Sequence, residues 1–169
     1  MHICEYGGGV APFSFTLCNI VSPEATFDIS LSDIEDCEHL NFGSWRLNKV
    51  KEDKNLANVT VDVQPVKANE LPKYKKKIDL AIIFEVLEHV PSPMKTLSNI
   101  MQQMNPKGFL LENFIAHQPG EAEDDGPDLD SAAAQRKQFY DIIKFNFNLV
   151  AGMPEETHPN DTRVWQLKY

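Results

Sequence analysis

The chain has 169 residues, of which 42% are hydrophobic, and it carries a formal net charge of −9. This length suffices for one domain with a substantial buried core, and the acidic balance argues against nucleic acid as a partner because phosphates would be repelled. The apolar runs are only strand-sized and residues 1–10 lack a signal pattern, so no membrane span is expected and the cytoplasm is the expected location. Three cysteines without a Cys-x-x-Cys pair predict free thiols and no metal site.

A strand pattern at the amino terminus ends at Tyr6 and runs into three consecutive glycines, Gly7, Gly8 and Gly9. Pro12 then begins a helix that we expect to continue to about residue 21. Glycine backbone can bend sharply and let a ligand approach, and a helix amino terminus presents free N–H groups to it. Taken alone, this turn is compatible with a nucleotide-type site or with a plain connection.

A second strand is expected over residues 25–34, with Asp33 at or near its carboxyl end. A helix should follow from Cys37 to Lys49. Strand, glycine turn, helix, strand and acidic residue is the order that places a carboxylate where it can accept hydrogen bonds from a ribose diol. The sequence therefore predicts a ligand site formed by the turn and this carboxylate.

Three more strands are predicted in the middle of the chain, over Val59–Val63, Ile78–Phe84 and Phe109–Ile115. The continuous apolar run of the second is typical of a central parallel strand that is buried on both faces. Ser92 and Pro93 start a helix, because a hydroxyl cap precedes a proline in the first turn. A Pro-Lys-Gly turn over 106–108 should introduce the last of these three strands.

From His117 to Asp130 the chain is rich in Pro, Gly and acidic residues, which predicts a surface loop, and Ser131 can begin another helix. Strands over 149–153 and 163–169, joined without a helix, should pair antiparallel. The alternation predicts a single α/β domain over 1–169. Its fold should be a doubly wound, Rossmann-like sheet, mostly parallel with a C-terminal antiparallel hairpin. Ligands bind such sheets at the carboxyl ends of the strands.

Two motifs resemble the class I S-adenosylmethionine-dependent methyltransferases. The segment from Glu5 to Ala11 resembles the family's first, glycine-rich motif, and the segment from Asp79 to Val90 is similar to its fourth-strand signature. In the second segment, Glu85, Glu88 and His89 directly follow a buried strand. The resemblance covers nearly the whole chain and implies S-adenosylmethionine as the cofactor.

The resemblance also implies roles for individual residues. The glycine turn would contact the methionine and ribose part of the cofactor, with Glu5 beneath it, and Asp33 would bind the ribose hydroxyls. Phe84 and Glu85 would lie beside the methionine moiety, and Ala68 and Asn69 would lie at the edge of the adenine. The implied cofactor-binding residues are Glu5, Gly7, Gly8, Gly9, Asp33, Ala68, Asn69, Phe84 and Glu85.

The chain departs from the family pattern in several places. Ala11 stands at the third glycine, and Lys67 replaces a frequent acidic residue before the adenine segment. The ribose ligand is either Asp33 or Asp28; Asp33 is preferred because Asp28 would be a charge buried in mid-strand. N-terminal lid helices are absent, so a partner chain, a missing N-terminal segment or the loop over 118–130 would have to cover the site.

Three functions are compatible with these residues. The first is methyl transfer from S-adenosylmethionine to a small-molecule acceptor or a protein, with His117 or His89 as a base where one is needed. For His89 a structural capping role is the alternative. The second is a non-catalytic, cofactor-binding subunit that lacks its lid. The third, a nicotinamide-dependent reductase, is disfavoured because Glu5 would repel a pyrophosphate.

Overall fold

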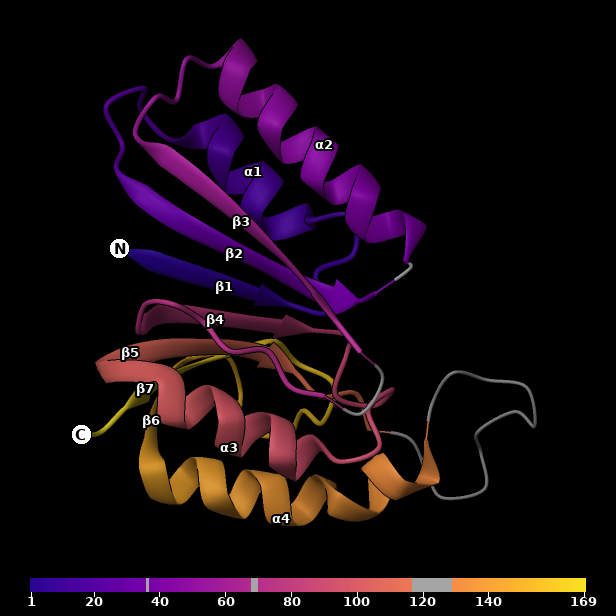
Figure 1. Cartoon of the computed structure of the whole chain (residues 1–169). Helices are drawn as coiled ribbons and strands as arrows, with labels where there is room; N and C mark the ends of the chain where they lie inside the picture. The colour runs from indigo at the N-terminus through magenta and orange to yellow at the C-terminus, as the bar shows by residue number, and fades with distance from the viewer. Residues whose placement is uncertain (36, 68–69, 117–128) are drawn as a thin grey trace. The chain divides into compact units, whose positions relative to one another are not determined.

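The computed structural model describes residues 1–35, 37–67, 70–116 and 129–169 (Figure 1). The chain divides into two compact units, Met1–Ile82 and Ile83–Tyr169. Among the helices in these described ranges, none is long and apolar enough to cross a bilayer.

Strands of the first unit follow the hydrogen-bonded order β3-β2-β1-β4, and β2 is parallel to both β1 and β3. Helices α1 and α2 pack against each other and lie together on one face of β1, β2 and β3 (Figure 1). The bounds are β1 (His2–Tyr6), α1 (Pro12–Ile20), β2 (Phe27–Ile34), α2 (Glu38–Asp53), β3 (Val59–Val66) and β4 (Ile78–Phe84). The last two residues of β4 belong to the second unit.

Alternating apolar residues explain this arrangement. Ile3, Ile29 and Leu31 of the strands are fully buried, as is Leu47 of α2, because one face of the sheet is covered by the helices. The β1–β2 register pairs His2 with Asp28 and Tyr6 with Ser32. In parallel strands this register brings both carboxyl ends to the same edge, where the turn after β1 begins.

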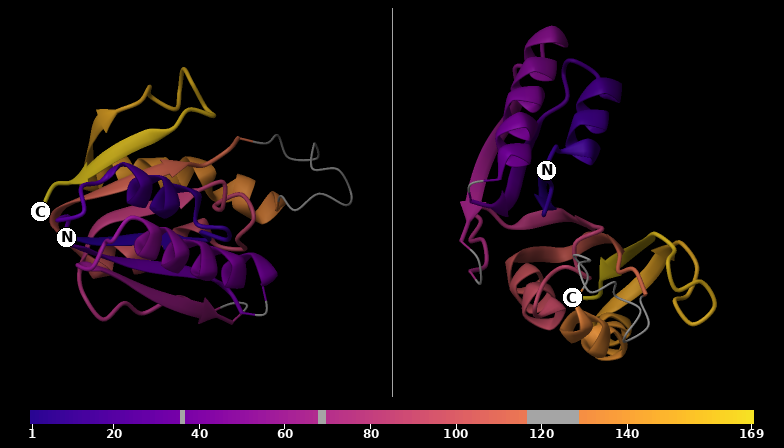
Figure 2. Two further views of the ribbon diagram at one scale, coloured as in Figure 1. Left: turned by 90° about the horizontal axis from the view of Figure 1, so that it is seen from above. Right: turned by 90° about the vertical axis from the view of Figure 1, so that its right-hand side faces the viewer.

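In the second unit, β7 lies between β5 and β6 and is antiparallel to both. Helices α3 and α4 pack against each other (Figure 2). The bounds are α3 (Pro93–Gln103), β5 (Met104–Asn113), α4 (Asp130–Asn146), β6 (Phe147–Ala151) and β7 (Arg163–Leu167). The predicted antiparallel pairing of the last two strands is confirmed.

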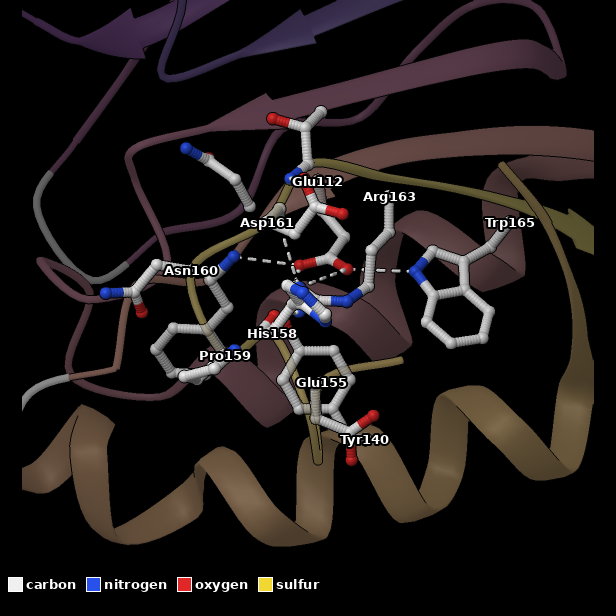
Figure 3. Close-up of polar contacts among 12 residues, drawn as sticks. Glu112, Tyr140, Glu155, His158, Pro159, Asn160, Asp161, Arg163 and Trp165 are labelled. Carbon is white, nitrogen blue, oxygen red and sulfur yellow. Dashed lines mark hydrogen bonds and ion pairs between the residues drawn. The ribbon is translucent and has the colours of Figure 1, made fainter. Parts of the chain in front are cut away.

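A polar cluster that is fully shielded from solvent lies inside the second unit. Glu112 of β5 and Arg163 of β7 are both 0% exposed, and their side chains face each other at 3.9 Å. Trp165 Nε1 and Tyr140 Oη donate to the Glu112 carboxylate at 2.8 and 2.9 Å (Figure 3). Arg163 also donates to the carbonyls of Met153, Asp161 and His158. The buried guanidinium therefore fixes the connection between β6 and β7.

Several predicted strand limits are wrong, including those of β6, which spans Phe147–Ala151 and not 149–153, and two of the differences have a clear physical reason. β5 begins at Met104, so the Pro-Lys-Gly segment lies inside the strand, with Lys107 at a φ of 64°. The Pro-Lys-Gly sequence predicted a turn, but here it is a local irregularity that the strand tolerates. β3 continues through Pro65 to Val66, beyond the predicted end. Since β3 is the outermost strand of its unit, a residue without an N–H is tolerated there.

Candidate functional site

The glycine turn between β1 and α1 has an unusual backbone. Gly7, Gly9 and Ala11 have φ values of 65°, 43° and 55°, all in the left-handed region. Gly7 N and Gly8 N both donate to Ser32 O, at 2.8 and 3.2 Å, which ties the turn to the end of β2. Ala11 stands where the resembling family has its third glycine, and it adopts a conformation that glycine would adopt without strain.

Gly8 is required by packing rather than by its backbone angles. A Cβ atom there would lie closer than 3.0 Å to Leu31 Cδ1 and to Glu5 Cγ. A side chain at this position would require Leu31, Glu5 or the turn itself to shift. Gly9 differs, since a Cβ atom would be in ordinary contact, 3.6 Å from Asp33 Oδ2, and only the positive φ disfavours a side chain.

Glu5 lies beneath the turn and is 2% exposed. Its carboxylate accepts hydrogen bonds from Phe13 N at 3.2 Å and Ser14 N at 2.9 Å. These are N–H groups of the first turn of α1, whose N-cap residue, Ala11, has no side chain able to accept them. Burial raises the pKa of Glu5, while these hydrogen bonds and the charge of Arg46 oppose the shift. Glu5 therefore caps α1 from the neighbouring strand.

Asp33 is joined to the turn by a hydrogen bond. Its Oδ2 atom accepts from Gly9 N at 2.7 Å, and its Oδ1 atom accepts from Ile34 N at the same distance. A carboxylate offers about four lone-pair sites, so two acceptor positions remain for an external diol. The structure thus brings together Glu5, the three glycines and Asp33, as the sequence predicted for the end of β2.

Asp28, the alternative ribose ligand, lies at the other end of β2. It lies five positions before Asp33, which is about 16 Å along an extended strand. Asp28 is paired with Lys76 at 2.7 Å and accepts from Thr60, and the hydrogen bond from Lys76 lowers its pKa. The expectation that Asp28 would be a charge buried in mid-strand is therefore wrong, because its side chain is 27% exposed. Its position still favours Asp33, which lies beside the turn.

In the second unit, Phe84 is half-buried at the end of β4 and Glu85 is exposed. Glu85 has a φ of 53°, and its N–H donates to Asn113 Oδ1 at 2.6 Å. Asn113 is 3% exposed and ends β5. No motif in the sequence indicated Asn113, because the strand predicted over Phe109–Ile115 placed this residue inside the strand and not at its end.

His89 is exposed, and its N–H donates to Val86 O at 3.0 Å in the turn after β4. This geometry is compatible with a capping role and with a proton-transfer role, so both remain predictions. The other proposed base, His117, and the two adenine-edge residues, Ala68 and Asn69, lie outside the described residues. Within the part of the chain that the structure describes, no group of three or more His, Cys, Asp or Glu residues could hold a metal ion.

The chain matches a protein-family model and solved structures of the same fold. The family model described as "Methyltransferase domain" matches residues 1–142. No curated protein matches the sequence. A SAM-dependent methyltransferase from Aquifex aeolicus is 16% identical, with a TM-score of 0.66 over 100% of this chain and 82% of its own. The glycopeptide N-methyltransferase MtfA, complexed with S-adenosyl-L-methionine, is 10% identical, with a TM-score of 0.63 over 99% of this chain and 81% of its own.

A third structure of the same fold is the [4+2]-cyclase SpnF, at 14% identity and a TM-score of 0.61. The match covers 90% of this chain and 53% of SpnF, so the chain spans about half the length of that protein. At these identities the structural matches show the fold alone. Together with the parallel pairs in the first unit and the antiparallel pairs in the second, they confirm the predicted Rossmann-like fold class.

Proposed function

Because this chain belongs to the methyltransferase-domain family, we propose that it transfers a methyl group from S-adenosylmethionine to an acceptor, which is a small molecule or a protein. One observation carries this proposal: Asp33 Oδ2 holds Gly9 N at 2.7 Å, which puts a carboxylate beside the glycine turn. A turn with free backbone approach and a carboxylate able to bind a diol are the two features that an adenosyl group requires.

The first unit would hold the ribose and the adjoining part of the cofactor through Gly7, Gly8, Gly9 and Asp33, with Glu5 beneath the turn. Phe84 and Glu85, which the resemblance assigns to the methionine part, belong to the second unit, and their role stays a prediction. S-adenosylmethionine supplies an electrophilic methyl group on a cationic sulfonium, which suits an acidic protein of net charge −9. The MtfA complex, which shares the fold and contains this cofactor, supports the assignment.

In this mechanism the chain's own residues contribute proximity and orientation for in-line displacement at the methyl carbon, and they exclude water. Where the acceptor is a hydroxyl or an amine, a base must remove its proton, and His89 or His117 would do so.

Isothermal titration calorimetry with S-adenosylhomocysteine tests the first step. We expect saturable binding by the wild-type chain and a weaker affinity for Asp33→Ala. Asp28→Ala is the matched control, because it removes a carboxylate from the same strand outside the proposed site. An assay with a labelled methyl group and candidate acceptors then tests transfer. Absence of binding by the wild-type chain would refute the proposal.

The second candidate is a non-catalytic subunit that binds the cofactor without transferring its methyl group. The likeness to SpnF supports keeping it, because a protein described as a cyclase has the same fold. Calorimetric binding combined with no turnover against any acceptor would favour this second function.

A further inference from the structure

We propose that Gly43 and Arg46 of α2 are positioning residues that hold the glycine turn in the shape that binds the cofactor. This inference rests on the proposed function, because it assigns the turn to S-adenosylmethionine. Neither residue belongs to the motifs that pointed to a methyltransferase. Both lie one helical turn apart, on the same side of α2, and both contact the backbone of the glycine turn.

Gly43 allows the helix to approach the turn at main-chain distance. A Cβ atom at this position would lie closer than 3.0 Å to Gly9 O, and 3.2 Å from both Val10 C and Leu31 Cδ2. Glycine is a poor helix former, so its presence within α2 requires a packing reason. The close approach to the Gly9 carbonyl supplies that reason.

Arg46 adds a directional contact to the same backbone segment. Its Nη1 atom donates to Val10 O at 3.1 Å. The guanidinium carbon lies 3.7 Å from the centre of the Phe15 ring of α1, so the planar group stacks on the ring while it donates. Stacking restricts the conformation of the Arg46 side chain, so its hydrogen bond holds the Val10 carbonyl in one position. A lysine could keep the charge but could not reproduce the planar stack.

The backbone at Gly9 and Val10 is therefore held from two sides. Asp33 holds the N–H of Gly9, whereas α2 contacts the carbonyls of Gly9 and Val10 through Gly43 and Arg46. Gly9 has a left-handed φ, and glycine changes its backbone angles easily because it has no Cβ atom. The contacts with Asp33 and α2 therefore decide which conformation the turn keeps. A turn released from α2 would sample other conformations and bind with lower apparent affinity.

The test compares Arg46→Met and Arg46→Lys with Lys49→Met in the full chain. Lys49 lies on the same helix and forms an exposed ion pair with Asp53, so its replacement removes one positive charge without touching the turn. We measure S-adenosylhomocysteine affinity by calorimetry, the thermal midpoint without ligand, and hydrogen exchange of the peptide covering residues 5–13. Arg46→Met should weaken affinity about tenfold or more and speed exchange in this peptide, with Arg46→Lys intermediate and Lys49→Met unchanged.

A merely structural role would lower the thermal midpoint and leave the affinity of the folded protein unchanged, and that result would overturn the inference. Gly43→Ala is an independent test variant. It should weaken the affinity for S-adenosylhomocysteine similarly, whereas Ser44→Ala, at the neighbouring position, should not. If the wild-type chain binds no S-adenosylhomocysteine, the proposed function fails. Hydrogen exchange then tests the positioning role by itself. Faster exchange at the turn in Arg46→Met supports this role, and unchanged exchange overturns it.

Discussion

Replacing Glu112 with glutamine tests how much the buried charged cluster stabilises the second unit. The substitution keeps one acceptor for Trp165 but puts an amide nitrogen in place of Oε2, which accepts from Phe114 N at 2.8 Å and from Tyr140 Oη at 2.9 Å. A buried N–H left without an acceptor costs about 1–3 kcal/mol. We therefore expect a loss of about 1–3 kcal/mol.

The pH dependence of this loss has a definite sign. Burial raises the pKa of Glu112, although hydrogen bonds from Trp165, Phe114 and Tyr140 and the charge of Arg163 oppose the shift. A carboxyl whose pKa is higher in the folded than in the unfolded state contributes stability that is fully present below the unfolded value, about 4.3. This contribution is lost as pH rises through the folded pKa. The difference between wild type and Glu112→Gln should therefore narrow as the pH is raised above about 4.3.

Urea denaturation followed by far-UV circular dichroism at several pH values measures both effects. Glu35→Gln is the matched control, since Glu35 is exposed and its replacement should change the free energy of unfolding by less than about 0.5 kcal/mol. The reasoning is refuted if Glu112→Gln is as stable as this control at every pH. It is also refuted if the difference from wild type widens with rising pH.

Three further substitutions give separate tests. Asp33→Ala removes the acceptor of Gly9 N and should weaken S-adenosylhomocysteine binding by about 1–3 kcal/mol in calorimetry; a normal affinity combined with a defect in Asp28→Ala would reverse the assignment. Gly9→Val, at a φ of 43°, should abolish binding while circular dichroism shows a retained fold, and normal binding would contradict the turn's role. Gly152→Ala, at a φ of 92° and with Thr162 O closer than 3.0 Å to the added Cβ, should lower stability by about 1–3 kcal/mol in thermal unfolding; an unchanged midpoint would show that the turn adapts.

Local patterns predicted those parts of the molecule that depend on neighbours in sequence. The helix that begins at Pro93 follows directly from the Ser92 hydroxyl, which accepts from Lys95 N as a cap should. Asp33 at the end of β2 follows from the apolar alternation before it. In both cases the determining residues lie within one turn or one strand of each other.

Contacts between distant parts of the chain were not predictable in the same way. Arg163 was expected only as the first residue of a strand, and nothing local indicated a charged residue with 0% exposure. Its burial depends on Glu112 standing opposite it in the β5–β7 register. Likewise, the need for Gly43 comes from the Gly9 carbonyl of another element, which periodicity within α2 cannot reveal.

The buried glutamates Glu5 and Glu112 have the same local task in the two units. Each is the penultimate residue of its strand and accepts hydrogen bonds from backbone N–H groups that lie beyond the strand's end. Both oxygens of Glu5 are engaged by N–H groups of α1, so capping alone explains a carboxylate at this point of the motif. A binding defect caused by replacing Glu5 would therefore report on the turn and the helix. Asp33 also holds Gly9 N, but its carboxylate keeps acceptor positions available, so its replacement reports on the ribose as well as on the turn.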